Sequence, residues 1–179
     1  MITYVKGDLL AGFIRDDINV LVHGCNCYCK MGGGIAKAIR DEFPEAYETD
    51  LSYDKKFDNK ADKLGTFSFT TVERHKHLDY LGKPIFKSYW SKGYIINAYT
   101  QDTYWDRKRM LSYDTIRTIM RTLNERIHPT YKIGMPLIGC GLAHGDWKIV
   151  SQILNEEFLD REIFVYYLEG AEKVIGETL

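Results

Sequence analysis

Three consecutive glycines, Gly32 to Gly34, stand directly before a stretch whose apolar residues recur at helical spacing. Glycines at such a point let the backbone approach a ligand closely, and the helix N-terminus adds partial positive charge. The pattern indicates a phosphate-binding loop, although a tight strand-to-helix turn without a ligand would look the same. The segment lacks the Gly-Lys-Ser/Thr ending of a P-loop and the spacing of the dinucleotide fingerprint, so any phosphate cradle here is of another kind.

A second glycine turn, Gly139-Cys140-Gly141, follows another apolar run and precedes a second helical pattern that begins at Trp147. In a parallel sheet both turns would open on the same edge, where α/β proteins bind their ligands. Two such loops can hold a diphosphate between them.

Three titratable residues near these turns could carry chemistry: His23, His144 and Asp146. His23 ends an expected strand, and a histidine can donate or accept a proton near neutral pH. A hydrogen-bonded structural histidine is the alternative. Asp146 is equally well placed to cap the helix that begins at Trp147.

Length, apolar content and net charge limit the classes of protein to which this chain can belong. A chain of 179 residues with 45% apolar content suits one domain over residues 1–179, and a net charge of -1 supplies no general attraction to nucleic acid. No stretch resembles a secretory signal or a membrane span, so we expect a cytoplasmic protein without a membrane partner.

The spacing of Cys25, Cys27 and Cys29 fits neither a disulfide framework nor paired zinc ligands. We expect buried thiols, and neither a metal nor a cofactor.

The elements that must position these residues alternate between strands and helices, which predicts an α/β fold with a largely parallel sheet covered on both faces. Residues 50–63 could be more helix or an exposed loop, and residues 73–92 a surface excursion or an irregular hairpin. Ser112 is the expected N-cap of a helix that runs to about Arg126. The expected strands are residues 2–5, 18–23, 66–72, 94–100, 132–137 and 162–168, and the other helices are residues 35–43 and 147–159.

Several segments resemble signature segments of the macrodomain family, in the family's order. They are Tyr4-Val5-Lys6-Gly7-Asp8-Leu9-Leu10, Val22-His23-Gly24-Cys25-Asn26-Cys27, the run from Met31 to Ala36, and Pro136-Leu137-Ile138-Gly139-Cys140-Gly141-Leu142. The resemblance spans essentially the whole chain. It implies a macrodomain-type three-layer sandwich, with a mixed, mostly parallel sheet and helices on both faces, that binds ADP-ribose. The branch it resembles most contains ADP-ribose-1''-phosphate phosphatases and some ADP-ribosyl glutamate hydrolases.

The resemblance also implies roles for single residues. Asp8 would accept a hydrogen bond from the adenine amino group, the backbone N–H of Leu9 would read the neighbouring ring nitrogen, and Asn26 would bind hydroxyls of the distal ribose. Tyr167 and Leu168 would line the adenine pocket. Backbone donors to the phosphates and distal ribose would come from Gly32, Gly33, Gly34, Ile35, Gly139, Cys140, Gly141, Leu142 and Ala143.

For a phosphatase, His23, His144 and Asp146 could divide the tasks of positioning water, stabilising charge and protonating the leaving oxygen. A second hypothesis is the release of ADP-ribose from a modified protein or nucleic acid, and a third is a reader that only binds. In one related hydrolase class a lysine and an aspartate react covalently, but the matching positions here are Gln101 and Ala143. We expect a monomer whose partner is ADP-ribose or ADP-ribose-1''-phosphate, with an ADP-ribosylated macromolecule as a further candidate.

Overall fold

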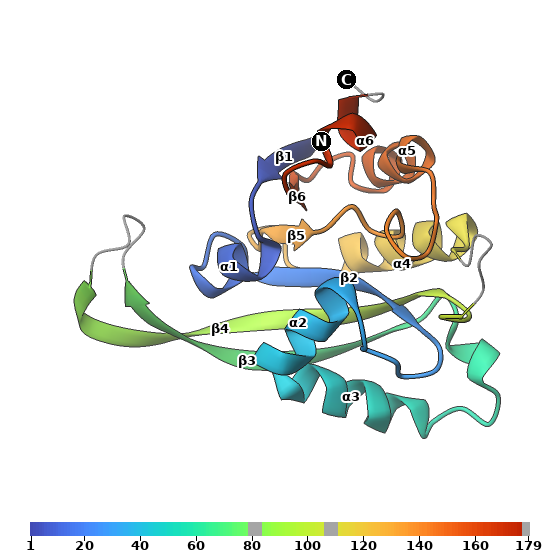
Figure 1. Ribbon diagram of the computed structural model, residues 1–179, viewed down its shortest axis with the longest axis horizontal. Helices are drawn as coiled ribbons and strands as arrows, with labels where there is room; N and C mark the ends of the chain where they lie inside the picture. The colour runs from blue at the N-terminus through green and yellow to red at the C-terminus, as the bar shows by residue number, and fades with distance from the viewer. Residues whose placement is uncertain (79–83, 106–110, 177–179) are drawn as a thin grey trace.

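The computed structural model describes residues 1–78, 84–105 and 111–176, and within these ranges it forms a six-stranded sheet (Figure 1). The strand order is β1-β6-β5-β2-β4-β3, and every neighbouring pair is parallel except β3 and β4. The strands are β1 (Ile2–Lys6), β2 (Val20–Asn26), β3 (Phe67–Leu78), β4 (Pro84–Gln101), β5 (Ile133–Met135) and β6 (Ile163–Tyr167).

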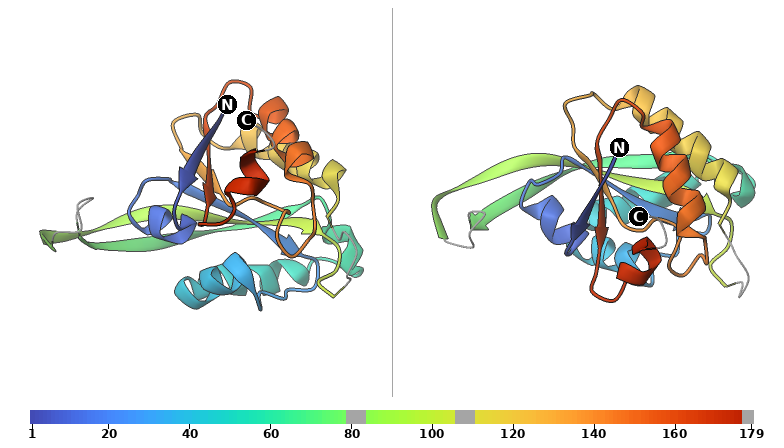
Figure 2. Two further views of the ribbon diagram at one scale, coloured as in Figure 1. Left: turned by 45° about the horizontal axis from the view of Figure 1, so that its top comes forward. Right: turned by 90° about the horizontal axis from the view of Figure 1, so that it is seen from above.

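Helices cover both faces of this sheet, which gives three layers (Figures 1 and 2). One face packs against α1 (Leu9–Ile14), α2 (Gly34–Glu42) and α3 (Pro44–Asp54). The opposite face packs against α4 (Tyr113–Arg126) and α5 (Trp147–Glu157). A short 3-10 helix, η1 (Lys60–Lys63), follows α3, and α6 (Glu172–Gly176) lies near the C-terminus. The expected α/β sandwich with a mostly parallel sheet is confirmed.

Alternate residues of the central strand, β2, point to opposite faces of the sheet, so the strand packs against both layers of helices. Val20 and Val22 of β2 pack toward α4 and α5, whereas Leu21 packs toward α1, α2 and α3. Because both faces are covered, the strand is buried almost throughout. One face of α4 is buried, whereas Ile149 of α5 is 41% exposed. The buried residues of α4 are Ile116, Ile119, Met120 and Leu123.

Several boundaries differ from the prediction. The strand expected at residues 18–23 continues as β2 to Asn26, so His23 lies within it. Neither α1 nor α6 was expected, and α3 starts earlier than residue 50, at Pro44, whose ring suits the first helical turn. Of the alternatives for residues 73–92, the hairpin is confirmed by the pairing of β3 with β4, and the connection at residues 79–83 lies outside the described residues. This hairpin extends well beyond the helices (Figure 2).

Candidate functional site

The parallel strands bring the predicted loops to one edge of the sheet. β2 and β5 are neighbours and run in the same direction, so the chain leaves both at the same edge. β1 and β6 are also parallel neighbours, with Lys6 opposite Tyr167. The segments that follow these four strands therefore share the carboxyl edge, where ligands of such sheets bind.

The first loop connects β2 to α2 and contains the glycine triplet. Gly32, Gly33 and Gly34 are exposed, and Gly34 has a φ of +55°, a left-handed conformation that glycine adopts without strain. Gly33 is the N-cap of α2 and provides no side chain to cap it. The N–H groups of the first helical turn lack partners within the helix, so this N-terminus can donate hydrogen bonds to an anion.

Asn26 stabilises the start of the same loop. Its Oδ1 accepts hydrogen bonds from the backbone N–H groups of Tyr28 at 2.9 Å and Lys30 at 3.2 Å, and its Nδ2 donates to the carbonyl of Lys30 at 2.9 Å. The side chain is nearly buried, at 6% exposure. The observed contacts are those of a loop former, and the predicted contact with a ribose stays a prediction.

The second loop follows β5 and turns at Gly139. The φ of Gly139 is +77°, and a Cβ there would lie 2.6 Å from Leu111 Cδ1, so a larger residue would be both strained and obstructed. At the tip of this loop, Leu142 is 71% exposed. A Cβ built on Gly33 would lie 3.5 Å from Leu142 Cδ1. The two glycine loops therefore lie close together.

His144 and Asp146 lie in the second loop and are exposed. Asp146 is the N-cap of α5, and its Oδ1 accepts a hydrogen bond from the N–H of Lys148 at 2.9 Å. The capping role considered for Asp146 is therefore observed. His144 has a φ of +56°, and its N–H donates to the carbonyl of Gly141 at 3.1 Å. The loop presents an imidazole and a carboxylate to solvent two residues apart.

His23 lies where the alternative of a hydrogen-bonded structural histidine would place it. Its side chain is 0% exposed, and its Nε2 lies 2.7 Å from Asn97 Oδ1. Burial lowers the pKa of His23 to about 4, so the ring is neutral at neutral pH. The reason is the length of β2: His23 shares the strand face of Leu21 and lies under the helices, not at the sheet edge. This position does not suit a proton donor or acceptor for a bound ligand.

The other end of the carboxyl edge holds the residues expected around adenine. The N–H of Gly7 donates to the carbonyl of Tyr167 at 2.9 Å, which places Asp8 and Leu168 on neighbouring segments. Asp8 caps α1 through a 3.0 Å hydrogen bond from the N–H of Ala11 to its Oδ1, and Leu168 is 64% exposed. The structure brings these residues together, and their contact with a ligand stays a prediction.

Comparison with known proteins identifies the fold. Residues 22–154 match the Macro domain family. The chain belongs to this family. It is 31% identical to the "Uncharacterized 17.5 kDa protein in tk-vs intergenic region" of Enterobacteria phage T4, over 92% of this chain and 95% of that protein. It is 29% identical to the ADP-ribose 1''-phosphate phosphatase of Debaryomyces hansenii, over 94% of this chain and 100% of the relative.

A solved structure agrees with the macrodomain assignment. The macrodomain of Mycobacterium tuberculosis DarG superimposes with a TM-score of 0.65 at 25% identity, and the match covers 93% of this chain and 97% of that one. The family and the fold implied by the signature segments are thus confirmed for this macrodomain.

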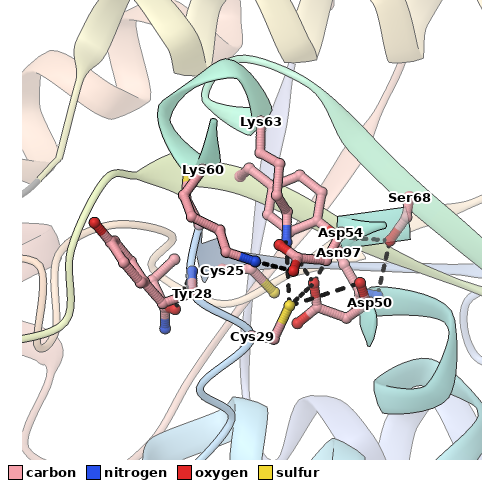
Figure 3. A network of polar contacts seen from close by, with 12 residues as sticks. Cys25, Tyr28, Cys29, Asp50, Asp54, Lys60, Lys63, Ser68 and Asn97 are labelled. Atoms are coloured by element: carbon pink, nitrogen blue, oxygen red, sulfur yellow. Dashed lines mark hydrogen bonds and ion pairs between the residues drawn. The ribbon is translucent and has the colours of Figure 1, made fainter. Parts of the chain in front are cut away.

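A buried polar cluster beneath the first glycine loop was not recognised in the sequence. Figure 3 shows Lys63 pointing toward Asp50, Asp54 and Cys29. Its Nζ lies 3.0 Å from Asp50 Oδ1, 3.1 Å from Asp54 Oδ1 and 3.2 Å from Cys29 Sγ. These residues lie in the charged stretch 50–63 and in the loop, and only the packing of α3 and η1 on the macrodomain sheet selects which charges are buried.

The four cysteines of the macrodomain are free thiols. Burial raises the pKa of Cys140 to about 12, so the second loop offers backbone groups at this position and not a thiolate. Among the described residues, no group of three or more potential ligands could hold a metal ion. In the same ranges, no helix has the length and apolar character needed to span a membrane.

Proposed function

We propose that this macrodomain binds ADP-ribose at the carboxyl edge of its sheet and removes the phosphate from ADP-ribose 1''-phosphate. The observation that carries the proposal is the proximity of Gly33 to Leu142, which places the N-terminus of α2, without a side-chain cap, next to the second glycine loop. The name of the Debaryomyces hansenii relative supports the choice of substrate.

The two loops would hold the diphosphate through backbone groups. The N–H groups at the start of α2 point out of the helix and carry its partial positive charge, which favours a dianionic ligand without any lysine or arginine. Exposed Gly32 and Gly33 carry no side chain that would keep the phosphates at a distance. Asp8 and Leu168, at the β1 and β6 side of the edge, would receive the adenine.

Hydrolysis of the phosphomonoester needs a water to attack phosphorus while the bond to the ribose oxygen breaks and that oxygen gains a proton. We assign the proton transfer to His144 and the orientation of the water to Asp146, because both are exposed in the loop after β5. The cap bond uses Oδ1 of Asp146 toward Lys148, and a carboxylate has a second oxygen that can accept a proton or a hydrogen bond. His23 takes no part, because it is buried.

Calorimetry with ADP-ribose, followed by measurement of phosphate released from ADP-ribose 1''-phosphate, tests the proposal. Binding together with release supports it. Binding without release would leave a reader of ADP-ribose, and the absence of binding would contradict the site itself.

The same protein should be incubated with ADP-ribosylated protein and DNA. Gln101 donates from its side-chain amide to the carbonyl of Thr103 at 3.0 Å, and Ala143 is buried, so neither position supplies a nucleophile or a carboxylate. We therefore expect no hydrolysis by the covalent lysine route. Release of free ADP-ribose would show that the protein removes ADP-ribose from macromolecules, and the phosphatase proposal would then give way to this second activity.

A further inference from the structure

The buried cluster around Lys63 is a charged group in the interior that the proposed reaction does not use. The side chains of Lys63 and Asp50 are 0% and 1% exposed. Asp50 Oδ1 also accepts a hydrogen bond from the hydroxyl of Tyr99 at 2.8 Å, and Lys63 Nζ lies 4.2 Å from the centre of the Tyr99 ring. A buried ammonium and carboxylate are tolerated because each has several polar partners.

The cluster extends across the sheet through hydrogen bonds. The Tyr99 hydroxyl lies 2.9 Å from Ser68 Oγ, which accepts a hydrogen bond from Asn97 Nδ2 at 3.1 Å. Asn97 Oδ1 in turn contacts His23. Hydrogen bonds therefore connect the ion pair to β3, β4 and β2, which lie next to the site.

Cys29 connects this anchor to the first glycine loop. Its Sγ lies 3.2 Å from Lys63 Nζ and 3.3 Å from Asp50 Oδ1. Cys29 has a φ of +54°, a left-handed conformation that is unfavourable for a residue with a side chain and needs support from its surroundings. Burial raises the pKa of the Cys29 thiol to about 11, so it stays protonated and can donate to the carboxylate.

Only two residues separate Cys29 from Gly32, so the conformation at Cys29 sets where the chain enters the glycine triplet. Figure 3 shows Tyr28 pointing away from the cluster while Cys29 points into it. Cys29 thus fastens one side of the loop to the ion pair, while Gly32 to Gly34 of the same loop are exposed.

We propose that the Lys63–Asp50 ion pair is a positioning group for the phosphate loop, which fixes Cys29 and thereby aims the backbone N–H groups of the glycine triplet. This inference rests on the proposed function for the identity of the ligand. The ion pair touches no substrate, so its effect is on the geometry of the loop and hence on affinity. Small displacements of donors weaken binding strongly, since hydrogen bonds depend on distance and angle.

The test uses the double variant Lys63→Met/Asp50→Asn, which removes both buried charges. Asp54, which also contacts Lys63, keeps its ion pair with Lys60. A matched control is Arg74→Met/Asp16→Asn. Arg74 is 1% exposed, pairs with Asp16, and donates to the carbonyls of Phe13 and Ile18 at 2.8 Å each. Ile18 lies before the start of β2, at the opposite edge from the glycine loops, so the control removes the ion pair of a buried arginine without touching either glycine loop.

Two readouts are compared between these variants. Calorimetry should show that the dissociation constant for ADP-ribose rises about tenfold or more in the Lys63/Asp50 variant and less than about twofold in the control. In the ligand-free proteins, the backbone amide NMR signals of Gly32 to Gly34 should shift in the first variant and stay in place in the control. If the Lys63–Asp50 ion pair only stabilises the fold, both double variants should lose stability. They should then not differ in ADP-ribose affinity or in the amide signals of the glycine triplet.

Two outcomes overturn the inference: wild-type affinity in the Lys63/Asp50 variant, or unchanged glycine amide signals. If wild-type protein fails to bind ADP-ribose, the proposed function fails, and the amide signals alone then decide whether the pair positions the loop.

Should the double variant not fold, Cys29→Gly and Cys29→Ser provide the test at the other end of the contact. Glycine accepts the left-handed conformation but loses both contacts of the sulfur, whereas serine keeps a polar atom there. We expect Cys29→Gly to weaken ADP-ribose binding about tenfold and to shift the glycine amides, and Cys29→Ser to stay within about twofold of wild type. Equal affinity in the two variants would contradict the proposal.

Discussion

Leu142 lies close to Gly33, and a Cβ built on Gly33 would be 3.5 Å from Leu142 Cδ1. The segment after β2 therefore lies next to the segment after β5, where we propose that the diphosphate is held. The same distance shows that Gly33 has room for a small side chain.

Gly33→Glu is expected to abolish ADP-ribose binding, or to weaken it at least about tenfold, because a carboxylate would stand where the phosphates bind. Gly33→Ala is the control: the φ of Gly33 is -150°, which any residue adopts, and the added methyl makes only ordinary contact with Leu142. Calorimetry with both variants separates charge from backbone effects. Tight binding by Gly33→Glu would show that the diphosphate lies elsewhere.

Asp146→Asn separates the cap of α5 from catalysis. Asparagine caps helices about as well as aspartate, so the free energy of unfolding should stay within about 0.5 kcal/mol of wild type. Loss of the carboxylate should lower kcat for phosphate release about 100-fold if Asp146 orients the water. Urea unfolding and a phosphate assay measure the two effects. An Asp146→Asn enzyme with full turnover would leave Asp146 as a cap alone.

Asp8 has the same double role at the adenine end. Asp8→Ser keeps a good N-cap for α1 but replaces the carboxylate with a hydroxyl on a shorter side chain. We expect little change in unfolding free energy and an ADP-ribose dissociation constant about tenfold higher, measured by calorimetry. Asp8→Ala, which also removes the cap, should cost a further ~1 kcal/mol of stability. Undiminished affinity in both variants would remove Asp8 from the site.

His23 makes the stability of the protein depend on pH. Burial lowers its pKa to about 4 in the folded state, while an unfolded chain binds the proton near the ordinary value of about 6.5. The unfolded state therefore holds more protons between these values, and the free energy of unfolding decreases as the pH falls from about 6.5 to 4, by ~3 kcal/mol in total.

Urea unfolding of wild type and His23→Gln over this pH range measures the effect. Glutamine can still donate to Asn97 Oδ1 but does not titrate, so the dependence on pH should be shallower in the variant. Phosphate release by His23→Gln should match wild type. The same pH dependence in both proteins would contradict the assignment of this dependence to His23. Loss of turnover without loss of stability would show that His23 takes part in the reaction.

Local sequence patterns predicted the fold class, a helix cap and the family of this protein. The alternation of apolar runs with helical periods predicted the mostly parallel sheet, the Ser112 cap is present as a hydrogen bond from the Thr115 N–H, and the signature segments implied the family that the comparisons confirm. These features depend on residues close together in the chain. The glycines that shape each loop could also be named, since their conformational freedom is a property of the residue itself.

Tertiary structure decided which polar side chains face a ligand and which are buried. His23 and His144 both follow apolar runs in the sequence, but β2 extends three residues past His23, and the helices cover that strand face. Lys63 and Asp50 lie in a stretch without apolar periodicity, and their burial depends on α3, η1 and the loop meeting over the sheet. Such contacts join residues distant in the chain, and no local pattern encodes them.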